Sequence, residues 1–109
     1  MTQEGIDLLL QKGFKRWTKN GKDRLYINAA QLGLECEYYH TGSIKHAEFR
    51  GEHISNSQAY RYKAAKTYVE LGPDRLVSDY PELEDAAAEL IATAFGLINK
   101  GLLLNKEVK

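Results

Sequence analysis

Cations and aromatic side chains are concentrated in the stretch between Lys12 and Arg24, which holds six Lys and Arg residues and a single acidic residue. Positive side chains neutralise phosphates, and flat rings stack on unpaired bases. This combination of residue types predicts contact with DNA or RNA. The residues expected to make that contact are Lys15, Arg16, Trp17, Lys19, Lys22, Arg24 and Tyr26.

A second cationic group lies near the end of a helix expected at about 56–66, and it adds Arg61, Lys63 and Lys66 to the predicted nucleic-acid surface. The whole chain is neutral, with 15 basic and 15 acidic residues, whereas dedicated nucleic-acid-binding domains are commonly basic. The charge is unevenly distributed, however, because residues 1–66 carry a net +4 and residues 67–109 a net −4. A neutral chain can therefore still present a positive face.

Two simpler interpretations of the basic stretch stay open. A lone Trp is more often a buried anchor than a binding residue, so Trp17 can belong to the core. Charged side chains along a hairpin also keep an edge strand from pairing with other chains.

A protein-interaction module is the alternative function, because seven Tyr and one Trp are many for 109 residues and both types favour interfaces. Its partner would be a host protein or a second copy of the chain. The residues concerned are Tyr38, Tyr39, Tyr60, Tyr62, Tyr68 and Tyr80.

Catalytic and metal-binding patterns are weak. Glu35 and Glu37 share one face of a predicted strand, which is typical of an exposed surface, and Ser55 is explained by helix capping. There is no Gly-rich phosphate loop. The candidate metal ligands lack the close pair usual in zinc sites; they are Cys36, His40, His46 and His53. We therefore expect no enzyme activity, no cofactor and no bound metal.

The basic stretch is predicted to form a β-hairpin with strands at 14–18 and 23–27, because Asn20-Gly21 is a strong signal for a two-residue turn. Alternation along the first strand places Lys15, Trp17 and Lys19 on one face and Phe14 and Arg16 on the other.

The remaining elements are predicted from alternation, capping and periodicity. Further hairpins are expected at 34–39 with 44–49 and at 67–71 with 74–78, and helices at 2–12, 56–66 and 82–98. Ser55 with Gln58, and Asp79 with Glu82, have the spacing of capping boxes. The last helix carries an apolar stripe of Leu83, Ala87, Leu90, Ile91, Ala94 and Ile98.

The fold class that follows is α+β, with a small antiparallel sheet built from hairpins, a central helix and a long C-terminal amphipathic helix on one face. We expect a single domain over residues 1–109, a short helix at 1–12 and a packed or frayed tail at 102–109. The apolar runs are too short to cross a membrane. The absence of a secretory signal and the lone Cys36 predict a cytoplasmic protein.

Several strings in the chain match a known group of sequences. They are K-R-W-T-K-N-G-K-D-R-L-Y-I-N-A from Lys15 to Ala29, the later Tyr38-Tyr39-x-Thr41-Gly42, Ile54 to Ser57, and Ala65 to Val69. Over about residues 13–79 the chain resembles a group of small uncharacterised proteins of Firmicutes, their phages and other mobile elements. The resemblance implies a bacterial or phage intracellular origin and brings no catalytic residues with it.

Overall fold

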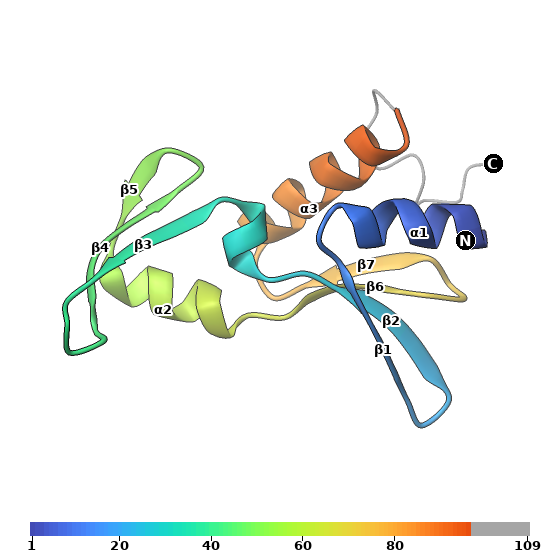
Figure 1. The fold of residues 1–109 in the computed structure, drawn as a ribbon, viewed down its shortest axis with the longest axis horizontal. Coiled ribbons are helices and arrows are strands. Elements are labelled where there is room, and N and C mark those ends of the chain that lie inside the picture. Colours follow the sequence, from blue (N-terminus) through green and yellow to red (C-terminus); the bar gives the residue numbers. More distant parts are fainter. Residues whose placement is uncertain (97–109) are drawn as a thin grey trace.

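A computed structural model describes residues 1–96 of the chain as an arrangement of short helices and two antiparallel sheets (Figure 1). The elements are α1 (Gln3–Gln11), β1 (Lys15–Lys19), β2 (Lys22–Tyr26), the 3-10 helix η1 (Ala29–Leu32), β3 (Leu34–Tyr38), β4 (Ile44–Phe49), β5 (Glu52–Ile54), α2 (Asn56–Ala64), β6 (Thr67–Glu70), β7 (Arg75–Ser78) and α3 (Pro81–Ala94). The α+β class predicted from the sequence is confirmed. No helix among these elements is long and apolar enough to cross a membrane.

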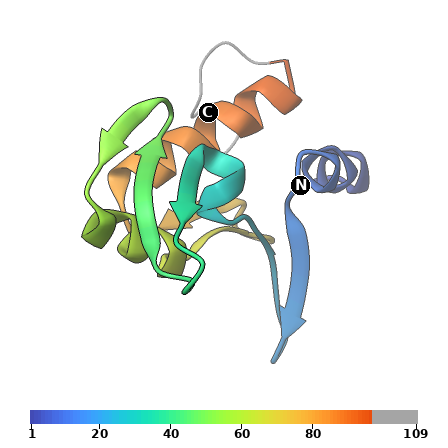
Figure 2. The same ribbon diagram turned by 60° about the vertical axis from the view of Figure 1, so that its left-hand side comes forward.

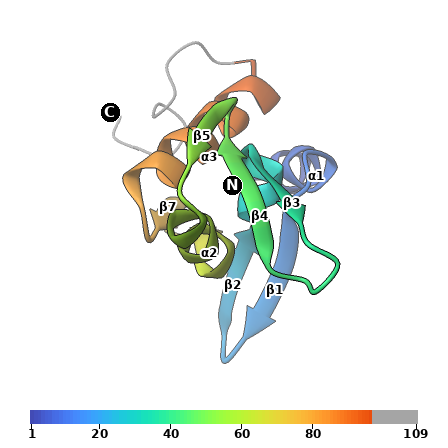
Figure 3. The same cartoon turned by 90° about the vertical axis from the view of Figure 1, so that its left-hand side faces the viewer.

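The first sheet has the strand order β1-β2-β6-β7, with all neighbours antiparallel. Its first hairpin turns at Asn20 and Gly21, whose φ angles of 54° and 77° are both positive, as the twist-matched two-residue turn requires. The tip of this hairpin projects beyond the rest of the molecule in all three views (Figures 1, 2 and 3).

The second sheet has the order β3-β4-β5 and packs one face on α2 (Figure 3). Ser55 caps this helix, because its side chain accepts a hydrogen bond from the backbone N–H of Gln58, as the capping-box spacing predicted. The 3-10 helix η1 connects β2 of the first sheet to β3 of the second. The hairpin β1–β2 and the second sheet are therefore adjacent in sequence but belong to different sheets.

The hydrophobic core joins the helices to both sheets. Helices α1 and α3 pack on one face of the four-stranded sheet, where Leu25 and Val69 are completely buried. Leu83 and Ile91 of α3 are 1% exposed, whereas Leu90 is only half-buried at the edge of the core. Ile98, the last residue of the predicted stripe, and the predicted tail at 102–109 lie outside the described residues.

Four expectations about the elements are wrong. The helix expected at 82–98 ends at Ala94. The single sheet is two sheets, because β2 pairs with β6 rather than with β3. The central helix ends at Ala64 and not at 66, since Thr67 already begins β6. Asp79 does not cap α3, because this helix begins after Tyr80 without a side-chain cap. The carboxylate of Asp79 instead accepts a hydrogen bond from the backbone N–H of Lys66.

Candidate functional site

The register of the four-stranded sheet gathers the basic stretch on one face. Lys15 lies opposite Tyr26, Trp17 opposite Arg24, and Lys19 opposite Lys22. Directly paired residues point to the same side of a sheet, so these six side chains share one face. The pairing of β6 and β7 extends the same face to Tyr68, Glu70 and Arg75.

We call this surface the basic face, and it consists of Lys15, Trp17, Lys19, Lys22, Arg24, Tyr26, Tyr68, Glu70, Arg75 and Val77, which lies opposite Tyr68. All of its side chains are exposed or half-buried, in contrast to Leu25 and Val69 on the other side of the sheet. Five cations and one carboxylate give it a positive charge that the neutral chain as a whole does not have.

Arg16 lies on the opposite side of the hairpin and is paired there. Its guanidinium donates two hydrogen bonds to the carboxylate of Asp23, with distances of 3.1 Å from Nε and 2.6 Å from Nη2. These bonds raise the pKa of Arg16 and lower the pKa of Asp23. The structure therefore separates Arg16 from the other hairpin cations, as the strand alternation predicted.

Trp17 is 44% exposed, so the interpretation of this residue as a buried core anchor is wrong. The anchor at the foot of the hairpin is Phe14, which is 2% exposed. Tyr26, on the neighbouring strand, is 36% exposed. Two large rings thus remain accessible on the same face as the cations.

Arg24 organises the rings of the basic face. Its guanidinium carbon lies 5.5 Å from the ring centre of Trp17 and 4.6 Å from that of Tyr68, so the cation sits against both π systems. Glu70 approaches Arg24 at 3.9 Å and Arg75 at 2.7 Å. The buried Nε of Arg24 has no hydrogen-bond partner among the residues described.

A groove of about 310 Å³ opens beside these rings. Its lining includes Trp17, Tyr26 and Tyr68, together with Lys66 and Asn28. Lys66 reaches the groove because α2 ends before it and the chain returns to the sheet at this point. We call this hollow the sheet groove.

The second cationic group is dispersed by the fold. Lys66 joins the sheet groove, whereas Arg61 is exposed on α2 and donates a hydrogen bond to Gln58. Lys63 lies in a different groove, of about 420 Å³, whose lining includes Asn28 and Tyr38. We call it the helix groove. Only part of the group predicted at 61–66 therefore lies beside the hairpin.

Lys63 is held in the helix groove by an aromatic partner. Its ammonium donates a hydrogen bond of 2.9 Å to the hydroxyl of Tyr38 and lies 4.8 Å from the centre of that ring. The hydrogen bond is the main reason why the pKa of Lys63 is raised.

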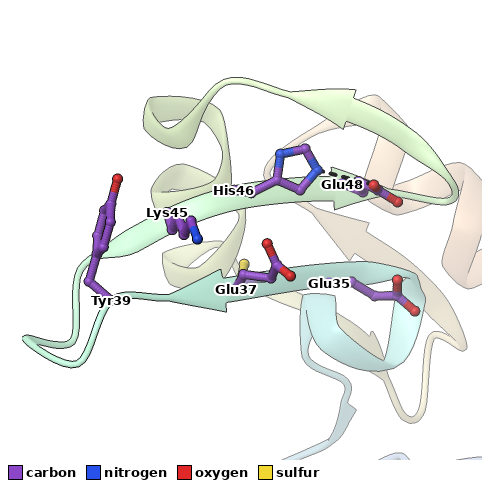
Figure 4. Close-up of a pocket in the computed structure, with 7 residues that line it drawn as sticks. Glu35, Glu37, Tyr39, Lys45, His46 and Glu48 are labelled. Atoms are coloured by element: carbon purple, nitrogen blue, oxygen red, sulfur yellow. Dashed lines mark hydrogen bonds and ion pairs between the residues drawn. The ribbon is translucent and has the colours of Figure 1, made fainter.

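The open face of the three-stranded sheet has the opposite chemistry. Pairing places Glu35 beside Glu48, and Glu37 beside His46. We call this surface the acidic face, and it consists of Glu35, Glu37, His46, Glu48 and His53. Its hollow, of about 830 Å³, is larger than either groove and extends along the strands to Tyr39 (Figure 4).

His46 contacts two other residues of the acidic face. Its Nε2 lies 3.1 Å from a carboxylate oxygen of Glu48 (Figure 4). Its ring also stacks on His53, with the ring centres 4.8 Å apart. Cys36 alternates to the other side of β3. Within residues 1–96, no group of three or more His, Cys, Asp and Glu side chains is arranged to hold a metal ion.

Tyr68 and Asn28 belong to the site, although the sequence did not predict them as part of a nucleic-acid surface. Alternation along 67–70 does place Tyr68 and Glu70 on one face, yet no local pattern indicates that this strand pairs with the basic hairpin. Asn28 carries no charge or ring that would mark it as a binding residue. No protein-family model, curated protein or solved structure matches the chain, so the resemblance over residues 13–79 stays a prediction.

Proposed function

We propose that the protein is a non-catalytic domain that binds nucleic acid through the basic face of its four-stranded sheet. The observation that carries the proposal is the shared orientation of Lys15, Trp17, Lys19, Lys22, Arg24 and Tyr26 on a side of the sheet that is open to solvent. Four cations beside two accessible rings supply both interactions that a polynucleotide needs, one for phosphates and one for bases.

The exposure of Trp17 strengthens the proposal. The ring of Trp17 is 44% exposed on a projecting hairpin, so it adds little to the hydrophobic core. Its exposed apolar surface is unfavourable in water. Cations that served only to protect the edge strand β1 would not need a ring between them. The arrangement is therefore better explained by a ligand that contacts the ring and the charges together.

The alternative function, a protein-interaction module built on the tyrosines, has less support. Tyr62 is buried between Phe49 and Tyr80, and the hydroxyl of Tyr60 accepts a hydrogen bond from the backbone of Ile44. Tyr62 thus has a structural role, and the hydroxyl of Tyr60 is bound to β4 although its ring stays 46% exposed. The proposal includes the cytoplasmic location expected from the sequence, where nucleic acid is accessible.

Fluorescence anisotropy with a labelled single-stranded oligonucleotide, titrated at several salt concentrations, tests the proposal. Replacing Lys15, Lys19 and Lys22 together by Ala should weaken binding. It should also flatten the dependence of log affinity on log salt by up to about 2, since each phosphate contact to a single strand contributes about 0.7. Thermal unfolding should change little, because exposed charges add little stability.

A charge-matched control is available in the same chain. The triple replacement of Lys12, Lys45 and Arg61 by Ala removes the same net charge from exposed positions away from the basic face. It should retain most of the affinity. Equal losses in the two triple variants would show that net charge alone matters and would overturn the basic face as the site. If the unmodified protein binds neither DNA nor RNA at low salt, while its mass in solution rises with concentration, self-association replaces the proposal.

A further inference from the structure

Two grooves of the protein meet at one residue. Asn28, between β2 and η1, lines both the sheet groove and the helix groove. Next to Asn28, the lining of the helix groove includes the small side chains of Ala29 and Ala30. Asn28 is thus a wall shared by the sheet groove, which Trp17 lines, and the helix groove, which Tyr38 lines.

The sheet groove and the helix groove contain the same combination of a cation and an aromatic ring. In the sheet groove Arg24 lies against the rings of Trp17 and Tyr68, and in the helix groove Lys63 lies against the ring of Tyr38. Tyr38 is 49% exposed although it is large and largely apolar. Each groove therefore offers a cation beside a ring that is open to solvent.

We propose that the ligand is a single strand and that it runs from the sheet groove past Asn28 into the helix groove, where Tyr38 and Lys63 form a second contact for a base and its phosphate. This inference rests on the nucleic-acid binding proposed above and extends it to the class and path of the ligand.

The geometry favours a single strand over a duplex. Rings can stack only on bases that are not already stacked and paired inside a helix. Trp17 and Tyr26 line the sheet groove and Tyr38 lines the helix groove, so each groove offers an accessible ring to an unpaired base. The ring and cation chemistry is common to single-stranded DNA and RNA, so binding of either supports the inference.

Replacement of Tyr38 by Ala provides the test, and replacement of Tyr39 by Ala is its matched control. The two tyrosines are neighbours and similarly exposed, at 49% and 52%, but Tyr39 belongs to the hollow of the acidic face. Affinities are measured for oligo(dT) and oligo(U) of about 4 and about 16 nucleotides, which span the usual range of site sizes for single-strand-binding domains. Circular dichroism verifies that both variants melt as the unmodified protein does.

Loss of one stacked base should weaken binding of the longer oligonucleotides about 5-fold to about 150-fold in the Tyr38→Ala variant and leave the Tyr39→Ala variant unchanged. A short oligonucleotide, held in the sheet groove, should respond to Trp17→Ala and not to Tyr38→Ala. An unlabelled duplex of the same length should compete poorly.

The failures of the two proposals are distinguishable. If Trp17→Ala weakens binding at both lengths while Tyr38→Ala and Tyr39→Ala behave alike, the path into the helix groove is overturned and the basic face stands. If a duplex competes as well as the single strand, the assignment to single strands is overturned. If no oligonucleotide binds at low salt, both proposals fail together.

Discussion

Each of the two sheets packs one face on helices and leaves the other open, but the two open faces have opposite charge. The basic face brings five cations together with Trp17, Tyr26 and Tyr68, while the acidic face brings together three carboxylates and two histidines. The chain as a whole is neutral although both faces are charged. Net charge is therefore a poor guide to what a surface of this protein attracts.

Both open faces contain a like-charged pair directly across two strands. Lys19 lies opposite Lys22, and Glu35 lies opposite Glu48. Like charges directly opposite one another are destabilising. Neither face is arranged for maximal stability, and the two differ in the sign of their charge and in the rings that lie among the cations of the basic face.

The largest effect on stability is expected from substitutions on the face of each sheet that packs against the helices. Leu25→Asp and Ala47→Asp should each unfold the protein, since both side chains are completely buried and an unpaired buried carboxylate costs several kcal/mol, on the order of the total stability. Lys15→Asp, on the open side of the first sheet, should change stability by only about 0.5 kcal/mol. Urea unfolding followed by circular dichroism measures all three. A Leu25→Asp protein with an unaltered midpoint would show that the faces have been assigned the wrong way round.

An effect of intermediate size is expected on nucleic-acid affinity, and it should distinguish the basic face from the acidic face. Lys19→Glu and Glu35→Lys each replace a like-charged pair by an opposite-charged one, so each should stabilise the fold by about 0.2–1 kcal/mol. Only Lys19→Glu should weaken nucleic-acid binding, by at least about tenfold, the equivalent of about 1.4 kcal/mol. Melting curves and anisotropy titrations on the same preparations provide both readouts. The comparison breaks if Lys19→Glu binds as tightly as Glu35→Lys.

The smallest effect concerns the ion pair on the side of the hairpin opposite the basic face. The Arg16 guanidinium lowers the pKa of Asp23, so the pair stabilises the folded protein above the ordinary pKa of the carboxyl, and this contribution is lost as the pH falls through the lowered value. Asp23→Asn should therefore melt slightly below the unmodified protein at neutral pH, and the difference should vanish in strong acid. Its affinity for nucleic acid should not fall, because Asp23 is not part of the basic face. A melting difference that persists unchanged into acid would contradict the pairing.

Local sequence signals account for most of the secondary structure. Asn20-Gly21 specifies its turn through two positive φ angles, and Ser55 caps α2 through its own hydroxyl. The alternation of Lys15, Trp17 and Lys19 against Phe14 and Arg16 also follows from the chain itself, because successive side chains of a strand point to opposite sides. These interactions join residues that are close in sequence, so the order of the residues is enough to predict them.

Tertiary pairing decided the rest. The β2–β6 ladder brings Tyr68 and Lys66 to the hairpin from about forty residues away and ends α2 before residue 66. The β6–β7 pairing places Asp79 beside the backbone of Lys66 and away from the cap of α3. The strand pattern allowed Trp17 to lie in the core or at the surface, since alternation does not indicate which face the helices cover. The sequence by itself determined the β1–β2, β3–β4 and β6–β7 hairpins, the cap of α2 and the composition of their strand faces, but not the pairing of β5 with β4. Which faces are open, and which distant side chains meet there, depended on backbone hydrogen bonds and apolar packing between segments that are far apart in the chain.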